Sequence, residues 1–227
     1  MLVLVVDTAT PAVQAAVCRL TRGDAEPLAW RRVVNARAHG ELLGPAIKEV
    51  LDEASVGPGE LAAVVAGTGP GPFTGLRVGL VTAAAMSQAL GIPAYGVCSL
   101  DGIGAATTGH TLVATDARRK EVYWARYVDG TRVAGPGVGR PELVGAQARA
   151  AGASGVAGEA ATRYADALGL PVVDGPSFPE LKMLARLAAE RVVSGKPSEV
   201  LTPLYLRRPD ATEPGRPKPV GPGARQR

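Results

Sequence analysis

The chain has 227 residues, 46% of them hydrophobic, so it is long enough to bury one large core or two small ones. No apolar run approaches the roughly 18 residues of a membrane-spanning helix, and the start MLVLVVD lacks the basic segment of a secretory signal. We therefore expect a cytoplasmic protein without a membrane partner. Its two cysteines, Cys18 and Cys98, lie in apolar segments without CxxC spacing, a pattern that favours buried, reduced thiols over redox chemistry.

The net charge of +4 is concentrated toward the C-terminal end of the sequence. From Arg207 onward there are six basic and two acidic residues, and the rest of the chain has nineteen of each. The stretch 209–227 contains five prolines and few apolar residues, so we expect it to be a disordered tail. Any contact of this tail with RNA would be electrostatic and nonspecific.

The first half of the chain alternates strand-like and helical patterns. The turn TATPA separates two apolar runs, which predicts an antiparallel strand pair, and from His39 the apolar residues recur at helical spacing. The sequence GPG at 57–59 predicts the end of that helix. We predict strands at 2–6, 13–20, 28–35 and 61–66, and helices at 39–54 and 76–90.

The second half of the chain begins like the first. A strand ends at Asp116 and another opens at Val122, six positions later, as Val13 follows Asp7 by six. This repeat predicts two lobes, 1–107 and 108–208, each opening with a hairpin whose turn carries an aspartate. Strands followed by helices in each half indicate an α/β fold with mixed sheets flanked by helices. Downstream we predict helices at 142–151, 159–168 and 179–193, and a short strand at 172–173.

The glycine-rich segment GTGPGPFTGLRVG at 67–79 resembles a phosphate-binding loop only superficially. It matches neither the Walker A spacing nor GxGxxG, and Pro70 and Pro72 each remove a backbone N–H donor. A stiff turn is favoured, with Thr74 expected to cap the following helix. An anion at that helix N-terminus, assisted by Arg77, is the less favoured alternative.

Catalytic groups are few in this sequence. The only two histidines, His39 and His110, lack the spacing of a metal-binding helix, so a zinc or iron hydrolase is not expected, and a helix-capping or surface role is favoured for His39. Asp7 and Asp116, at strand ends, are open to two interpretations: a carboxylate pair facing a cleft, or local turn formation, which is favoured. The helix at 76–90 is apolar nearly all round, which predicts that both of its sides are covered, one by its own sheet and the other by the preceding helix or by another chain.

Several of these segments together resemble the TsaB (YeaZ) family over nearly all of residues 1–208. They are VDTAT at 6–10, GTGPGPFTGLRVG, YGVCSL at 95–100, DARRKEVYWARY at 116–127 and PLYLRR at 203–208. The resemblance implies a two-lobed actin-like (ribonuclease H-like) ATPase fold and a non-catalytic partner of TsaD. TsaD transfers a threonylcarbamoyl group to N6 of the adenosine 3′ of the anticodon in tRNAs that read ANN codons.

The resemblance also implies an assembly and a set of sites. TsaE joins the complex, tRNA is held mainly through the complex, and the chain pairs with itself when TsaD is absent. No cofactor or metal of its own is implied, although ATP or ADP at the TsaD interface is compatible with the family, and Asp7, Thr8 and Asp116 are candidates for a vestigial cofactor site. The implied partner-interface residues are His39, Leu42, Leu43, Ala46, Arg77, Leu80, Ala84 and Gln88. A glycoprotease-like peptidase and an autonomous actin-like kinase remain the alternatives.

Overall fold

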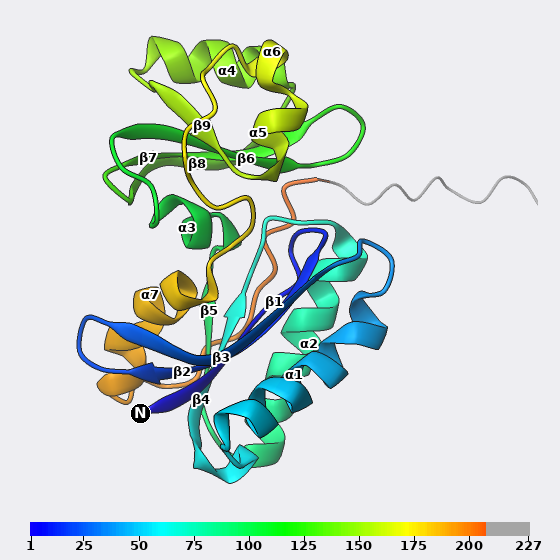
Figure 1. Ribbon diagram of the computed structural model, residues 1–227, viewed down its shortest axis with the longest axis vertical. Coiled ribbons are helices and arrows are strands. Elements are labelled where there is room, and N and C mark those ends of the chain that lie inside the picture. Colours follow the sequence, from blue (N-terminus) through cyan, green and yellow to red (C-terminus); the bar gives the residue numbers. More distant parts are fainter. Residues whose placement is uncertain (208–227) are drawn as a thin grey trace, which may run out of the picture.

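The computed structural model describes residues 1–207, and the predicted tail at 209–227 lies outside the described residues. The described chain forms two lobes, each built on its own mixed sheet with helices packed against it (Figure 1). This is the predicted α/β architecture of mixed sheets flanked by helices. Within residues 1–207, no helix is both long and apolar enough to cross a membrane.

The first lobe contains a five-stranded sheet in the order β3-β2-β1-β4-β5. β1 pairs antiparallel with β2 and parallel with β4, and its residues from Val3 to Val6 are almost fully buried because helices cover both faces of the sheet. The strands are β1 (Leu2–Asp7), β2 (Ala12–Leu20), β3 (Ala25–Val34), β4 (Leu61–Gly67) and β5 (Ala94–Val97).

Two long helices, α1 (His39–Ala54) and α2 (Phe73–Leu90), lie side by side on one face of this sheet (Figure 1). Their apolar faces share one core cluster with the strands, which includes Leu43, Leu76 and Leu80. α1 ends at Ala54 with Ser55 in the left-handed conformation, and the 3-10 turn η1 (Pro58–Glu60) leads into β4. The GPG sequence therefore lies just beyond the helix end.

The second lobe repeats the strand order of the first, as β8-β7-β6-β9. β6 and β7 pair antiparallel up to Asp116, just as β1 and β2 pair up to Asp7, which confirms the predicted pair of aspartate-ended hairpins. The elements of this lobe are β6 (His110–Asp116), β7 (Val122–Val128), β8 (Thr131–Gly139), α4 (Pro141–Ala150), β9 (Gly155–Ala157), α5 (Glu159–Arg163) and α6 (Ala165–Leu168).

The chain crosses between the lobes more than once. α3 (Ser99–Gly104) leads from the first sheet to the second, and α7 (Leu181–Val193) returns to cover the open face of the first sheet. The apolar side of α7, which includes Leu184 and Val192, completes the second core cluster of the first lobe. The predicted second lobe at 108–208 therefore includes a helix, α7, that packs on the first lobe. It does so because α7 covers the second face of the first sheet.

The segment after α7 also belongs to the first lobe. Its backbone follows the edge of β5, with Glu199 N–H donating to the Ala94 carbonyl at 2.9 Å and Leu204 N–H donating to the Thr68 carbonyl at 2.8 Å. The Glu199 carboxylate accepts a bond from the Gly96 N–H at 3.0 Å and pairs with Arg191. This segment, residues 198–205, thus lies beside α2 at the edge of the sheet.

Two predicted elements are interrupted. The helix predicted at 159–168 is split at Tyr164, whose backbone leaves the helical region and whose hydroxyl donates to the Asp116 carboxylate at 3.2 Å. The strand predicted at 172–173 is a single bridge between Val156 and Val172.

Candidate functional site

A cleft of about 400 Å³ lies between the two lobes. One side is formed by the β1–β2 turn, the loop before α1 and the first turn of α2, and the other by the β6–β7 turn of the second lobe. The polar and aromatic residues that line it are Thr10, Arg37, His39, Phe73, Thr74, Asp116, Arg118, Tyr123, Tyr205 and Arg207.

Asp7, a predicted cofactor residue, does not face this cleft. Its side chain is fully buried, with one oxygen accepting a bond from the Ser99 hydroxyl at 2.5 Å and the other accepting from the Ala9 N–H at 3.1 Å. A Cβ on Gly67 would lie 1.8 Å from Asp7 Oδ2, so the backbone is packed directly against the carboxyl group. Burial raises the pKa of Asp7 to about 6, although both hydrogen bonds act in the opposite direction. Its immediate role in the structure is to join β1 to the start of α3.

Thr8 is also bonded within the protein. Its hydroxyl donates to the Gly75 carbonyl at 2.7 Å and accepts from the Gly79 N–H at 3.0 Å. A Cβ on Gly79 would lie 2.5 Å from Thr8 Oγ1, so only glycine lets α2 approach this hydroxyl so closely. Thr8 therefore fastens the β1–β2 turn to α2.

Asp116 is the one predicted cofactor residue that lines the cleft. Its carboxylate is paired with Arg163 at 3.1 Å and accepts a bond from the Tyr164 hydroxyl. The structure thus does not bring Asp7 and Asp116 together as a carboxylate pair facing the cleft, because one is enclosed in the first lobe and the other is bonded within the second. Among residues 1–207, no three His, Cys, Asp or Glu side chains are grouped so that they would hold a metal ion.

Two backbone donors of the glycine-rich loop form hydrogen bonds within the protein. The Thr68 N–H donates to the Val97 carbonyl at 2.7 Å, and the Gly69 N–H donates to the Ser99 hydroxyl at 3.1 Å. Gly71 lies against the backbone of Ala9, where a Cβ would meet the Ala9 carbonyl oxygen at 2.2 Å. This geometry agrees with the stiff turn predicted from the prolines.

The start of α2 differs from the prediction in its cap. The helix begins at Phe73 with Pro72 as its N-cap residue and has no side-chain cap, so Thr74 is already within the first turn. Pro72 has no side-chain acceptor, and its carbonyl accepts the Leu76 N–H at 3.0 Å as the first helical bond. The sequence FTG suggested Thr74 only because threonine is a common cap.

His39 joins three elements of the first lobe. Its imidazole Nε2 lies 2.8 Å from the Thr10 carbonyl, and the ring lies against Gly75 of α2, where a Cβ would be 3.3 Å from Nε2. His39 is buried in this position. It therefore holds the start of α1 against the β1–β2 turn rather than standing on the surface or presenting itself to a partner.

The other predicted interface residues fall into two groups. Leu43, Ala46 and Leu80 are buried in the core of the first lobe, since each faces the sheet, and Leu42 is half-buried. Arg77, Ala84 and Gln88 are exposed on the outer side of α2.

Val81 was missed by the sequence reasoning, although it is 65% exposed on the outer side of α2. It lies four positions after Arg77 and three before Ala84, so helical periodicity would have found it. Together with Ala84, Ala85 and Ala89 it forms an exposed apolar strip on the outer side of α2, which also carries Arg77 and Gln88.

A shallow apolar groove of about 620 Å³ runs between α2 and the segment 198–205. At one end Tyr205 lies against Phe73 with a centroid separation of 5.1 Å, and its hydroxyl accepts a bond from Arg77 Nε at 2.8 Å. The Arg77 guanidinium in turn lies over the Phe73 ring at 3.9 Å. These three side chains fix the last part of the described chain against the first turns of α2.

Comparison with known proteins connects this architecture to one family. Residues 33–205 match the family model described as TsaD, tRNA N6-adenosine threonylcarbamoyltransferase. The chain is 52% identical over 209 residues to an uncharacterized protein of Mycobacterium tuberculosis, which covers 92% of this chain and 93% of that protein. An uncharacterized protein of Mycobacterium leprae is 51% identical over 212 residues, and there the match covers 92% of this chain but 56% of the longer relative.

Two further similarities carry names. The tRNA threonylcarbamoyladenosine biosynthesis protein TsaB of Escherichia coli is 32% identical over 139 residues, covering 56% of this chain and 55% of that one. A solved structure from Pseudomonas aeruginosa, described as an uncharacterized protein with similarity to peptidase YEAZ, superposes with a TM-score of 0.74 at 30% identity and covers 91% of this chain and 99% of its own. With the family model spanning most of its length, this chain belongs to the TsaD/YeaZ (TsaB) family.

Proposed function

We propose that this protein is a non-catalytic, TsaB-type subunit that pairs with TsaD and activates it for threonylcarbamoyl transfer. The acceptor is N6 of the adenosine 3′ of the anticodon in tRNAs that read ANN codons. The name of the Escherichia coli relative and the family model both support a place in threonylcarbamoyladenosine biosynthesis.

The observation that carries the proposal is the uncovered outer side of α2. Val81 is 65% exposed, and Ala84, Ala85 and Ala89 continue the same face, so the helix presents an apolar strip with small side chains. Such a strip lets the backbone of a second helix approach closely, as in helix pairs packed through small residues. A helix of TsaD, or α2 of a second copy when TsaD is absent, fits this surface.

The geometry near β1 supports a subunit without chemistry of its own. The side-chain polar atoms of Asp7 and Thr8, two of the candidate cofactor residues, are bonded to Ser99, Ala9 and α2. We therefore expect transferase chemistry to reside in TsaD. A nucleotide bound at the joint interface, and recruitment of TsaE to the pair, are part of the same proposal.

The pairing is tested with Val81→Arg and Ala84→Arg. Each places a charged side chain in the centre of the proposed seam, so we expect TsaD affinity to fall by at least about thirtyfold while the fold is kept. Leu80→Arg is not a useful test, because Leu80 is 5% exposed and belongs to the core. Leu143→Arg on α4 is the matched control, since Leu143 is 63% exposed and far from α2 in the fold (Figure 1).

The assay is co-purification of each variant with TsaD from the same organism, alongside formation of threonylcarbamoyladenosine in an ANN-reading tRNA. We expect the control to bind and activate TsaD like the unaltered chain, and the two α2 variants to lose both properties together. If both α2 variants pair normally with TsaD, this face is not the interface.

A further inference from the structure

The β6–β7 turn has an unusual backbone. Arg118, Arg119 and Lys120 all have positive φ, at 61°, 49° and 60°. Left-handed backbone costs a non-glycine residue about 1 kcal/mol or more, so three in succession form a strained turn that the surrounding structure must hold. Two backbone bonds hold it, from Ala117 N–H to the Glu121 carbonyl at 2.9 Å and from Glu121 N–H to the Arg118 carbonyl at 3.0 Å.

The same turn receives the end of the described chain. Arg207 Nη1 donates to the Ala117 carbonyl at 2.7 Å, and Nη2 lies 3.6 Å from a Glu121 carboxylate oxygen. The sequence that continues from Arg207 adds five basic and two acidic residues. The basic end of the sequence therefore starts beside the turn that carries three cations.

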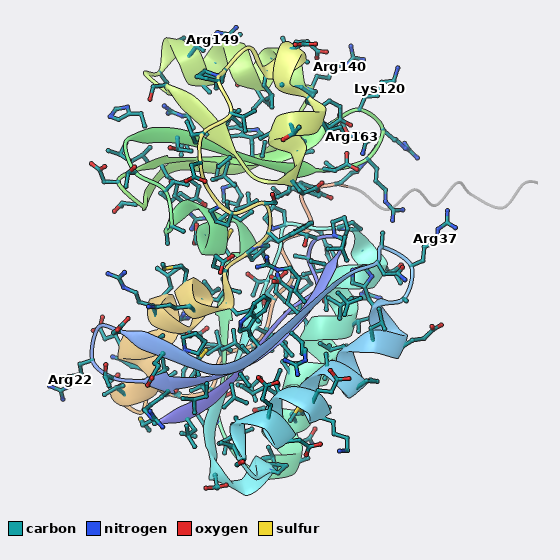
Figure 2. All side chains as sticks on the ribbon, viewed as in Figure 1. Arg22, Arg37, Lys120, Arg140, Arg149 and Arg163 are labelled. Carbon is teal, nitrogen blue, oxygen red and sulfur yellow. The ribbon has the colours of Figure 1, made fainter. Side chains whose placement is uncertain are left out.

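Arg37 adds a cation from the first lobe. It lies in the loop between β3 and α1, and Arg37, Arg118 and Arg207 line the same cleft between the lobes. Figure 2 shows Arg37 and Lys120 on the same side of the molecule, one from each lobe, with Arg140 and Arg163 continuing along the second lobe. We name Arg37, Arg118 and Lys120 the basic rim.

Nearby carboxylates do not neutralise the basic rim. Asp116 is paired with Arg163 and Glu121 with Arg207, and within residues 1–207 no ion pair involves Arg37, Arg118 or Lys120. All three rim side chains are exposed, and Arg37 and Arg118 also form part of the cleft wall. The rim thus presents positive charge from both lobes, with Arg37 and Arg118 at the cleft and Lys120 outside its lining.

We propose that the basic rim binds the phosphate backbone of RNA. Cations spread over a broad exposed surface match a ligand with phosphates at regular spacing, and binding of this kind releases counterions and weakens steeply with salt. A single small anion would instead need donors that point to one position. The choice of tRNA as the RNA rests on the proposed function. The inference that the rim binds RNA rests on the charges and positions of its side chains.

The test compares two triple variants of the full chain that remove the same charge. In the rim variant, Arg37→Gln is combined with Arg118→Asn and Lys120→Asn, because asparagine tolerates positive φ better than most residues. The control variant carries three exposed cations changed elsewhere on the first lobe: Arg22→Gln, Arg186→Gln and Lys196→Gln. Arg22 lies on the opposite side of the molecule from Arg37 (Figure 2).

Fluorescence anisotropy with an ANN-reading tRNA transcript gives the affinity of each chain over a range of salt concentrations. We expect the rim variant to bind at least about tenfold more weakly than the control variant at 0.1 M salt. The slope of log affinity against log salt should fall by about two to three relative to the control, since each of the three lost phosphate contacts removes about 0.7 to 0.9.

Equal affinities and slopes for the two triple variants overturn the proposal. The proposal is also overturned if poly-glutamate of matched charge displaces the labelled tRNA as well as unlabelled tRNA does. That result would assign the rim to an acidic protein. Co-purification with TsaD is measured for the same variants, and we expect both to pair normally. Loss of tRNA binding by the rim variant with intact TsaD pairing supports RNA binding by the rim. Failure of the unaltered chain to pair with TsaD would contradict the proposed function but not RNA binding by the rim.

Discussion

Replacing Asp7 by asparagine distinguishes a buried structural carboxyl group from a ligand-binding one. Asparagine has nearly the same shape, accepts from the Ala9 N–H as the carboxylate does, and places an amide beside the Ser99 hydroxyl. The change therefore removes mainly the ionisation of a side chain that is fully buried.

The size of the effect follows from the pKa of Asp7, which burial raises from its ordinary 3.8 to about 6. Because the folded chain binds this proton more tightly than the unfolded chain, the associated stability is fully present below pH 3.8 and is lost as the pH rises through about 6. Across the whole range the loss amounts to about 3 kcal/mol, and between about pH 4.5 and 7.5 it is about 2 kcal/mol.

The asparagine variant has no such loss. We expect its free energy of unfolding, relative to that of the unaltered chain, to increase by about 2 kcal/mol between about pH 4.5 and 7.5. Urea unfolding of both chains at several pH values measures this difference directly. A pH-independent difference, or a variant that becomes relatively less stable toward pH 7.5, would refute a buried carboxyl group that is costly to ionise. Activation of TsaD should be retained by the variant.

Two substitutions and one labelling experiment test the packing of the lobes. Gly67→Ala forces a Cβ to within 1.8 Å of Asp7 Oδ2, so we expect a loss of about 3 kcal/mol and a melting temperature on the order of 10 °C lower. Tyr127→Phe removes the 2.8 Å bond from the phenol to the Asp101 carboxylate, and urea unfolding should show a loss of about 1 to 2 kcal/mol. Burial raises the pKa of Cys18 to about 12, so iodoacetamide at neutral pH should label this thiol only after unfolding, and rapid labelling of the folded chain would contradict its burial.

Local patterns in the sequence were sufficient for most of the fold. The helix from His39 to Ala54 has the predicted bounds. Each sheet contains the predicted hairpin, with Asp7 at the end of β1 and Asp116 at the end of β6. These features depend on periodicity and turn residues that lie close together in the chain. The pairing of two neighbouring strands can therefore be predicted from their alternating apolar residues and the turn between them, without knowledge of distant contacts.

Features that depend on distant contacts were not predictable in the same way. The sequence of α7 shows an amphipathic helix but not which sheet its apolar side covers, and the structure places it on the first lobe. The burial of Asp7 depends on Ser99, which is 92 positions away in the chain. Tyr164 interrupts its helix at a point where its hydroxyl reaches Asp116 in another element.

The helix at 76–90 was predicted from the sequence, but which of its residues face solvent was not. Motif resemblance pointed to the 76–90 helix as a whole, and it could not separate Leu80, which faces the sheet, from its neighbour Val81, which faces solvent. The orientation of a helix about its axis is set by the packing of its core side, which includes Leu76 and Ala83. Only the packed structure fixes which residues remain for a partner.

The measurement that most directly tests the proposed role is reconstitution of tRNA modification with purified components. TsaD and TsaE of the same organism are supplied with ATP, threonylcarbamoyl-AMP and an ANN-reading tRNA, with and without this chain. We predict threonylcarbamoyladenosine only when this chain and TsaD are both present, and none from this chain alone. Equally fast modification by TsaD in its absence, or modification by this chain without TsaD, would contradict the role of a non-catalytic activating subunit.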